Sequence, residues 1–86
     1  MATRGSVRIG NVYYYIRSDA YPSFALHILK KAVRRAKSRR SFIRIANELA
    51  GFRWIDGRAP KKFINSPFEE HRYIVNLSKR TVKKAF

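Results

Sequence analysis

The stretch SVRIGNVYYYIR, residues 6–17, decides the fold. Strand-forming residues lie on both sides of Gly10-Asn11, and this dipeptide is typical of a two-residue hairpin turn. Such a turn places Ile9 opposite Val12 and sorts the side chains by alternation onto two faces. One face carries Val7, Ile9, Val12, Tyr14 and Ile16. The other face carries Arg8, Tyr13, Tyr15 and Arg17. The stretch therefore predicts an antiparallel β-hairpin whose apolar face needs a covering layer.

Two helices are predicted to supply that layer. Pro22 suits a first helical turn, because its missing N–H would have no intrahelical partner there. From residue 22 to about residue 38, apolar residues recur at helical spacing and face away from basic ones. We expect Ser41 to cap a second helix from residue 42 to about residue 50, with Gly51 at its end.

The remaining sequence predicts a long loop and a second hairpin. Residues 52–67 hold several turn-forming residues, which favour a loop with at most a short strand. Residues 71–78 and 81–86 have strand character around a Lys79-Arg80 turn. The order is then ββααββ. We expect an α+β, two-layer fold, in which an antiparallel sheet from the N- and C-terminal hairpins is covered by two helices. Residues 1–86 are enough for one domain.

One sequence pattern resembles that of known proteins. Thr3-Arg4-Gly5, the hairpin, Asp19-Ala20-Tyr21-Pro22 and the basic helix follow one another in this order. The pattern is similar to that of small uncharacterised microbial and viral proteins with Thr-Arg-Gly near the N-terminus, a strand, Asp-Gly-Tyr-Pro and a following helix. Ala20 stands where that pattern has Gly. The resemblance implies a fold and no activity.

The composition favours a polyanionic partner. The chain has 20 Lys and Arg against 5 Asp and Glu, a formal net charge of +15. Such an excess points to nucleic acid, either DNA or RNA. The absence of cysteine excludes disulfides and Cys-bound zinc. No apolar run is long enough for a signal peptide or a membrane span, so we expect a cytoplasmic protein without a membrane partner.

The cations gather in two segments. Eight of them, with no acid between them, lie within residues 27–44: Lys30, Lys31, Arg34, Arg35, Lys37, Arg39, Arg40 and Arg44. The C-terminal segment adds Lys79, Arg80, Lys83 and Lys84. We expect these side chains to contact phosphates, mainly from the helix at residues 22–38 and without strong sequence specificity. Whether the two segments form one patch or two is left open by the sequence.

Two tyrosines are candidates for base stacking. Tyr13 and Tyr15 alternate with Arg17 on the polar face of the hairpin, an arrangement that suits single strands. The same rings could instead pack across strands, lie under the loop at residues 52–67, or form the seam of a homodimer. A helix-turn-helix is disfavoured, because the second helix offers few polar side chains for base recognition.

The sequence gives little support for a catalytic site. Glu69, Glu70 and His71 form the only acid/His cluster, and on a strand Glu69 and His71 would share a side. We expect no enzymatic activity, no cofactor, no metal and no small-molecule substrate. The alternative function is a protein-interaction or homodimerisation module that binds an acidic protein partner. A role at a membrane surface is a weaker hypothesis, because the apolar side of the basic helix is needed for the core.

Overall fold

The N-terminal hairpin forms in the predicted register. A computed structural model describes residues 3–86 and pairs β1 (Gly5–Ile9) with β2 (Val12–Ile16) in antiparallel fashion. Ile9 lies opposite Val12, and Gly10 adopts a φ of 63°, a left-handed conformation that glycine enters without strain. Val7, Ile9 and Ile16 are buried, whereas the other two residues predicted on this face are half-buried.

Both predicted helices are present, with different ends. α1 spans Pro22–Arg35 and α2 spans Arg39–Ala50. The predicted N-cap of α2 is wrong: Ser38, not Ser41, caps this helix. The Ser38 hydroxyl accepts the N–H of Ser41, and the Ser41 hydroxyl accepts the N–H of Ser38, which forms a reciprocal capping box. Arg39 and Arg40, which precede the predicted start of this helix, therefore belong to its first turn.

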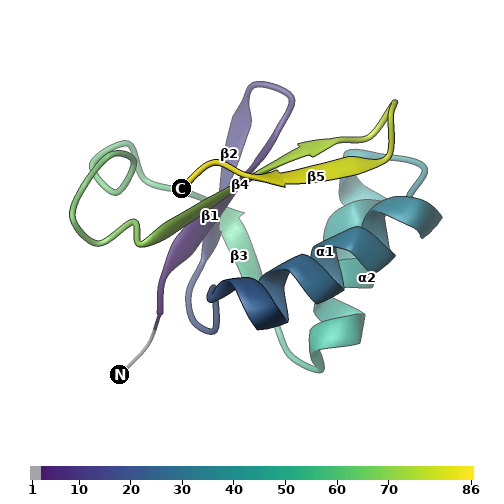
Figure 1. Ribbon diagram of the computed structural model, residues 1–86, viewed down its shortest axis with the longest axis horizontal. Coiled ribbons are helices and arrows are strands. Elements are labelled where there is room, and N and C mark those ends of the chain that lie inside the picture. Colours follow the sequence, from purple (N-terminus) through teal and green to yellow (C-terminus); the bar gives the residue numbers. More distant parts are fainter. Residues whose placement is uncertain (1–2) are drawn as a thin grey trace.

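The predicted antiparallel sheet is wrong in one pairing. Three further strands, β3 (Ile55–Arg58), β4 (His71–Asn76) and β5 (Thr81–Lys84), complete a five-stranded sheet of order β3-β2-β1-β4-β5 (Figure 1). β4 is parallel to β1, so the sheet is mixed and the order is ββααβββ. The reason is the segment 59–70, which leaves β3 at one edge and crosses to the beginning of β1, where the Glu70 N–H donates to the Arg4 carbonyl. β4 must then run in the direction of β1.

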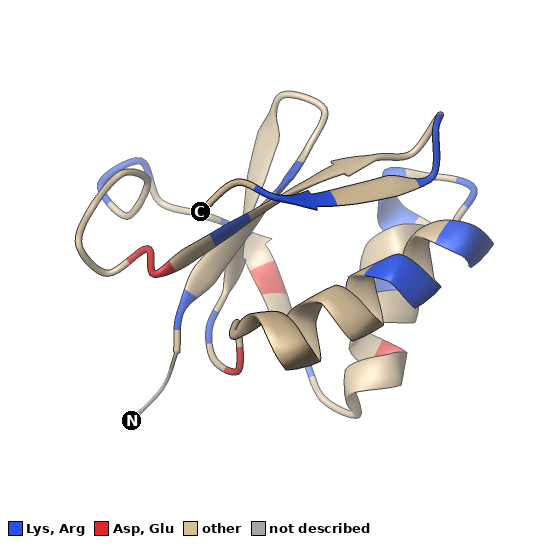
Figure 2. Cartoon of the chain, viewed as in Figure 1, with Lys and Arg blue, Asp and Glu red and all other residues tan. Residues whose placement is uncertain are grey.

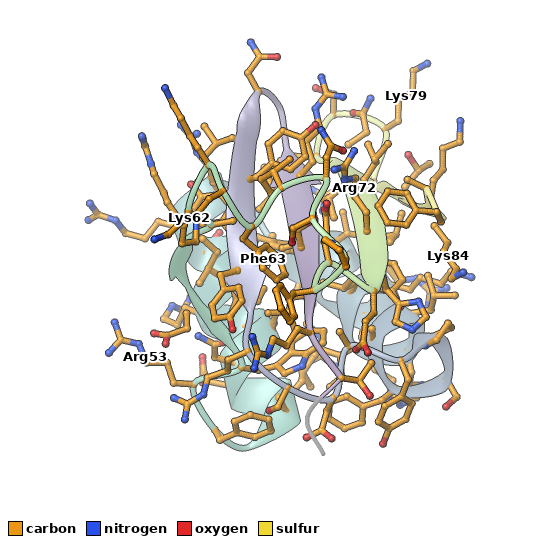
Figure 3. All side chains as sticks on the ribbon, turned by 90° about the vertical axis from the view of Figure 1, so that its left-hand side faces the viewer. Arg53, Lys62, Phe63, Arg72, Lys79 and Lys84 are labelled. Carbon is orange, nitrogen blue, oxygen red and sulfur yellow. The ribbon has the colours of Figure 1, made fainter. Side chains whose placement is uncertain are left out.

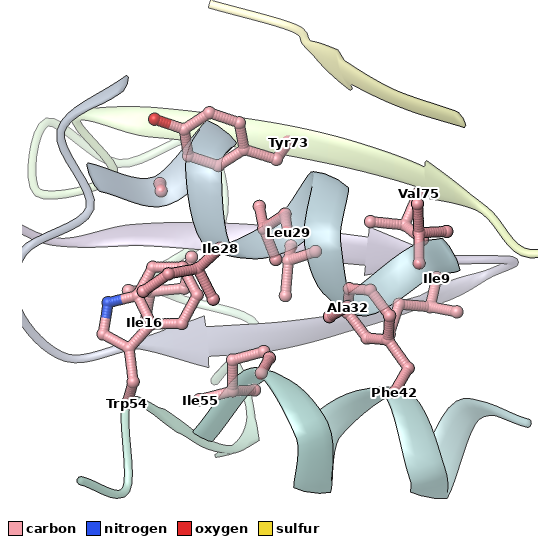
Figure 4. Close-up of a cluster of buried hydrophobic side chains, with 14 of the residues drawn as sticks. Ile9, Ile16, Ile28, Leu29, Ala32, Phe42, Trp54, Ile55, Tyr73 and Val75 are labelled. Atoms are coloured by element: carbon pink, nitrogen blue, oxygen red, sulfur yellow. The ribbon is translucent and has the colours of Figure 1, made fainter. Parts of the chain in front are cut away.

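The core lies between the sheet and the helices (Figure 4). Leu29 and Ala32 of α1 and Phe42 of α2 are fully buried against the sheet. Two polar atoms in this layer are satisfied: the Trp54 indole N–H donates to the Ser18 carbonyl at 2.8 Å, and the Tyr73 hydroxyl donates to the Ala20 carbonyl at 2.6 Å. Burial raises the pKa of Tyr73 to about 12. Neither helix among residues 3–86 is long and apolar enough to cross a membrane.

Candidate nucleic-acid interface

The cations of α1 occupy its solvent face. Lys30, Lys31, Arg34 and Arg35 are exposed, whereas Ala25, Ile28, Leu29, Ala32 and Val33 are buried. This division follows the helical period that the sequence shows. Arg34 and Arg35 lie in the last turn, where cations also interact favourably with the negative end of the helix dipole. The basic end of α1 points toward the β4–β5 turn (Figure 2).

Arg80 joins the two basic segments. Its Nη1 donates to the carbonyls of Val33, Arg34 and Ala36 at 2.9, 2.8 and 3.2 Å, and so caps the C-terminal end of α1. Arg80 itself has a φ of 54°, in the left-handed region. These bonds hold the β4–β5 turn, with Lys79, against the basic end of α1. The two basic segments therefore meet. Arg80 was predicted to contact phosphate, but its Nη1 is hydrogen-bonded to the end of α1.

The junction between the helices and the first turn of α2 add cations to the same end of the molecule. Lys37, Arg39 and Arg40, which the sequence predicted to contact phosphates, are exposed. Arg44 differs, because its Nη1 lies 2.9 Å from a carboxylate oxygen of Glu48 one turn later. Both side chains of that pair are largely exposed, so the pair is screened by water and neutralises Arg44 only in part.

The two lysines of β5 lie on opposite faces of the sheet. Lys84 pairs in register with Tyr73 and therefore lies on the helix-covered face, whereas Lys83 pairs with Ile74 and lies on the outer face. Figure 3 shows Lys84 at the margin of the sheet. Because side chains alternate along a strand, Lys84 lies on the same side of the sheet as α1 and Lys83 lies on the opposite side.

Tyr13 and Tyr15 already have partners within the protein. Tyr15 meets the ring of Phe63 edge to face, with ring centroids 5.0 Å apart. The guanidinium groups of Arg72 and Arg8 lie 5.1 and 5.9 Å from the centroid of the Tyr13 ring. Phe63 belongs to the segment 59–70, which lies over the outer face of the sheet (Figure 3). Both tyrosines are half-buried by these contacts, one of the arrangements that the sequence left open.

A buried ion pair holds the segment 59–70 in place. Glu69 accepts hydrogen bonds from the Ser6 hydroxyl, the Asn65 N–H and the Arg72 guanidinium, whose Nη2 lies 2.7 Å from Oε1. Burial raises the pKa of Glu69, but the bonds from Arg72, Ser6 and Asn65 outweigh it and hold that pKa below its usual value. The sequence did not reveal this cluster, because a spacing of three residues brings side chains together on a helix but not along a strand.

The predicted acid/His cluster is not brought together. Glu69 is bound on the outer face, whereas His71 stacks near Tyr73 on the helix-covered face, with ring centroids 6.4 Å apart. Burial, aided by the charge of Lys84 and opposed by that of Glu70, lowers the pKa of His71. Across residues 3–86, no three His, Asp or Glu side chains gather as metal ligands.

Two grooves beside Arg39, at the start of α2, were not predicted from the sequence. A crevice of about 820 Å³ lies between the tip of the β1–β2 hairpin and the end of β4, and Arg8, Asn11, Arg39 and Asn76 are among its lining residues. A second groove, of about 550 Å³, lies between the first turn of α2 and the sheet. Arg39 lines both, and the second groove also takes in Arg40 and Arg58. Their lining residues include no Asp or Glu.

The Asp and Glu residues lie away from the cations at the end of α1 and in the β4–β5 turn (Figure 2). Glu48, Asp56 and Glu69 form ion pairs with arginines elsewhere in the fold. Comparisons of the chain with protein-family models, curated proteins and solved structures gave no match.

Proposed function

We propose that the protein binds nucleic acid through the phosphate backbone, using the basic end of the molecule. The basic end consists of exposed cations from α1, the junction after it, the first turn of α2 and the β4–β5 turn: Lys30, Lys31, Arg34, Arg35, Lys37, Arg39, Arg40 and Lys79. The observation that carries the proposal is the docking of Arg80 on α1, which unites two basic segments distant in sequence. Cations held together in this way neutralise successive phosphates and release condensed counterions.

Contacts to phosphates favour binding with little sequence specificity. The exposed side of α2, which a recognition helix would use, carries Arg44 and Glu48, and these two residues pair with each other. Phosphate contacts fix position on a nucleic acid and carry no base information. The proposed activity is binding without catalysis, and a cytoplasmic location belongs to the same proposal, since intracellular DNA or RNA would be the partner.

A salt titration tests the proposal. The affinity of the wild type for a fluorescent 20-nucleotide DNA, single-stranded or duplex, is measured by anisotropy across a salt series. The double variant Lys30→Gln/Arg34→Gln removes two cations one helical turn apart. The slope of log K against log salt should fall by about 1.8 on duplex and about 1.4 on a single strand, at roughly 0.9 and 0.7 per lost contact.

The matched control removes the same charge elsewhere. Lys61→Gln/Lys62→Gln changes two exposed lysines in the segment 59–70 and should leave the slope unchanged. An equal fall in both variants would show that net charge alone, and not the basic end, determines binding. Absence of salt-dependent binding by the wild type would contradict the proposal and favour the alternative, an acidic protein partner.

A further inference from the structure

The crevice at the basic end arises from the sheet topology. β1 and β4 are neighbours and run parallel, so their carboxyl ends meet at one edge of the sheet. From there β1 turns into β2 on one side, and β4 turns into β5 on the other. Two hairpins that leave adjacent strands in opposite directions diverge at their tips, as Figure 1 shows. The crevice of about 820 Å³ lies at this divergence.

The walls of the crevice combine an apolar surface with polar groups that retain free donors. Its apolar wall is formed by the half-buried Val12, Ile74 and Leu77, with the buried Ile9 and Val75 behind them. Asn76 accepts the Lys79 N–H through Oδ1 at 3.0 Å, which leaves its side-chain NH₂ free of this bond. Arg8 donates from Nε to the Gly10 carbonyl at 2.8 Å, which leaves its terminal nitrogens outside that bond. Arg39 adds a positive charge at the α2 side.

We propose that this crevice accepts an unpaired nucleobase of a single-stranded nucleic acid, a conclusion that rests on the proposed function and deepens it. A base has two apolar faces and a polar edge, which match the apolar wall and the amide and guanidinium donors. The phosphates on either side of the base would be neutralised by Arg39 and Lys79. A paired and stacked base cannot enter such a site without first leaving the duplex.

The size of the crevice suits an unpaired base. The crevice is within the range of roughly 300–1,000 Å³ typical of small-ligand sites, so it can hold a base with part of its sugar. The rings of Tyr13 and Tyr15, in contrast, are already in contact with Arg72 and Phe63. The crevice therefore replaces the tyrosine face of the hairpin as the site at which a base is held.

Filling the crevice tests the inference. Ser78, which lines the crevice, is exposed, and Ser78→Trp adds a large ring there without a change of charge. Asn11→Trp fills the crevice from the opposite wall and provides a second variant. Ser23→Trp, exposed in the first turn of α1, is the matched control. Thermal unfolding followed by circular dichroism verifies that each variant is folded.

The probes are an oligodeoxynucleotide with one 2-aminopurine and its duplex with the complementary strand. The wild type should bind the single strand about tenfold more tightly, and 2-aminopurine fluorescence should rise as the base leaves its stacked neighbours. Ser78→Trp and Asn11→Trp should remove the preference and the fluorescence rise but keep the salt slope, because the phosphate contacts remain. Ser23→Trp should behave like the wild type.

The outcomes separate the crevice from the proposed function. Equal affinity of the wild type for single strand and duplex, with binding to both weakened by salt, would overturn the crevice inference and leave phosphate binding intact. Unchanged single-strand preference in both filling variants would also overturn it. Failure of the wild type to bind either probe at low salt would overturn the proposed function itself.

Discussion

Replacing Glu69 by glutamine removes one charge from the interior and keeps the shape of the side chain. The Glu69 side chain is 0% exposed and its partner Arg72 is 14% exposed. In the wild type, the carboxylate accepts from the Ser6 hydroxyl, the Asn65 N–H and two nitrogens of Arg72. Glutamine has only one acceptor oxygen, and its NH₂ would face donors. Arg72 would then be left largely buried without a counter-charge.

The cost follows from that loss. Breaking a fully buried ion pair destabilises a protein by about 3–5 kcal/mol, because one charge stays buried and uncompensated. The partial exposure of Arg72 relieves some of this penalty, so we expect Glu69→Gln to cost about 2–3 kcal/mol. For a domain of this size, the melting temperature should fall by on the order of 10–20 °C. Glu48→Gln is the matched control: its exposed pair with Arg44 should contribute under about 0.5 kcal/mol.

The pH dependence provides a second readout in the same assay. The folded-state pKa of Glu69 lies below its ordinary value of 4.5, so the ionised carboxylate stabilises the fold fully above that pH. This contribution is lost as the pH falls from 4.5 through the folded-state pKa. Chemical denaturation between pH 7 and pH 3 should show the difference between wild type and Glu69→Gln shrinking as acid is added. A variant within about 2 °C of the wild type at pH 7, or a difference independent of pH, would refute the buried clamp.

Two further substitutions test other parts of the fold. Arg80→Ala removes the cap on the last carbonyls of α1 and should cost about 1–2 kcal/mol, and it should weaken protection of the β4–β5 amides in hydrogen exchange; unaltered protection would show that the turn docks without the cap. Gly5→Ala would place a Cβ 2.6 Å from the His71 carbonyl oxygen and 2.9 Å from the Ala20 Cβ, so it should cost about 1–3 kcal/mol in chemical denaturation. Gly10→Asn, at a turn with nothing within 4 Å, should cost far less, and equal losses at the two glycines would contradict the packing at Gly5.

Local patterns predicted the elements of this fold better than their assembly. The hairpin register follows from Gly10-Asn11 and alternation, and the buried stripe of α1 follows from its helical period. The parallel pairing of β1 with β4 could not be foreseen, because it depends on where the segment 59–70 returns to the sheet. The bond between Glu70 and Arg4 joins residues far apart in sequence, and no periodicity reports such a contact.

In the candidate site, too, some features were predictable from the sequence and others were not. Exposure of the α1 cations was predictable, since a charged face opposite an apolar stripe must point to solvent. The cap that Arg80 forms on α1 was not predictable, because the sequence does not distinguish a basic turn residue that caps a helix from one that is free in solvent. Ser38 and Ser41 illustrate the limit at short range: both are good N-caps, and only the reciprocal bonds between them decide which residue begins α2.

The placement of charge supplies the strongest physical reason to expect an anionic ligand. A fold with 20 cations and 5 acids could reduce repulsion by setting its acids among its cations. Here Glu48, Asp56 and Glu69 pair with arginines elsewhere, and the two grooves at the basic end are lined by no acid. The docking of Arg80 then brings more positive charge to the end of α1, which raises the repulsion further. A polyanion that binds the folded basic end relieves this repulsion, so binding and folding stabilise each other.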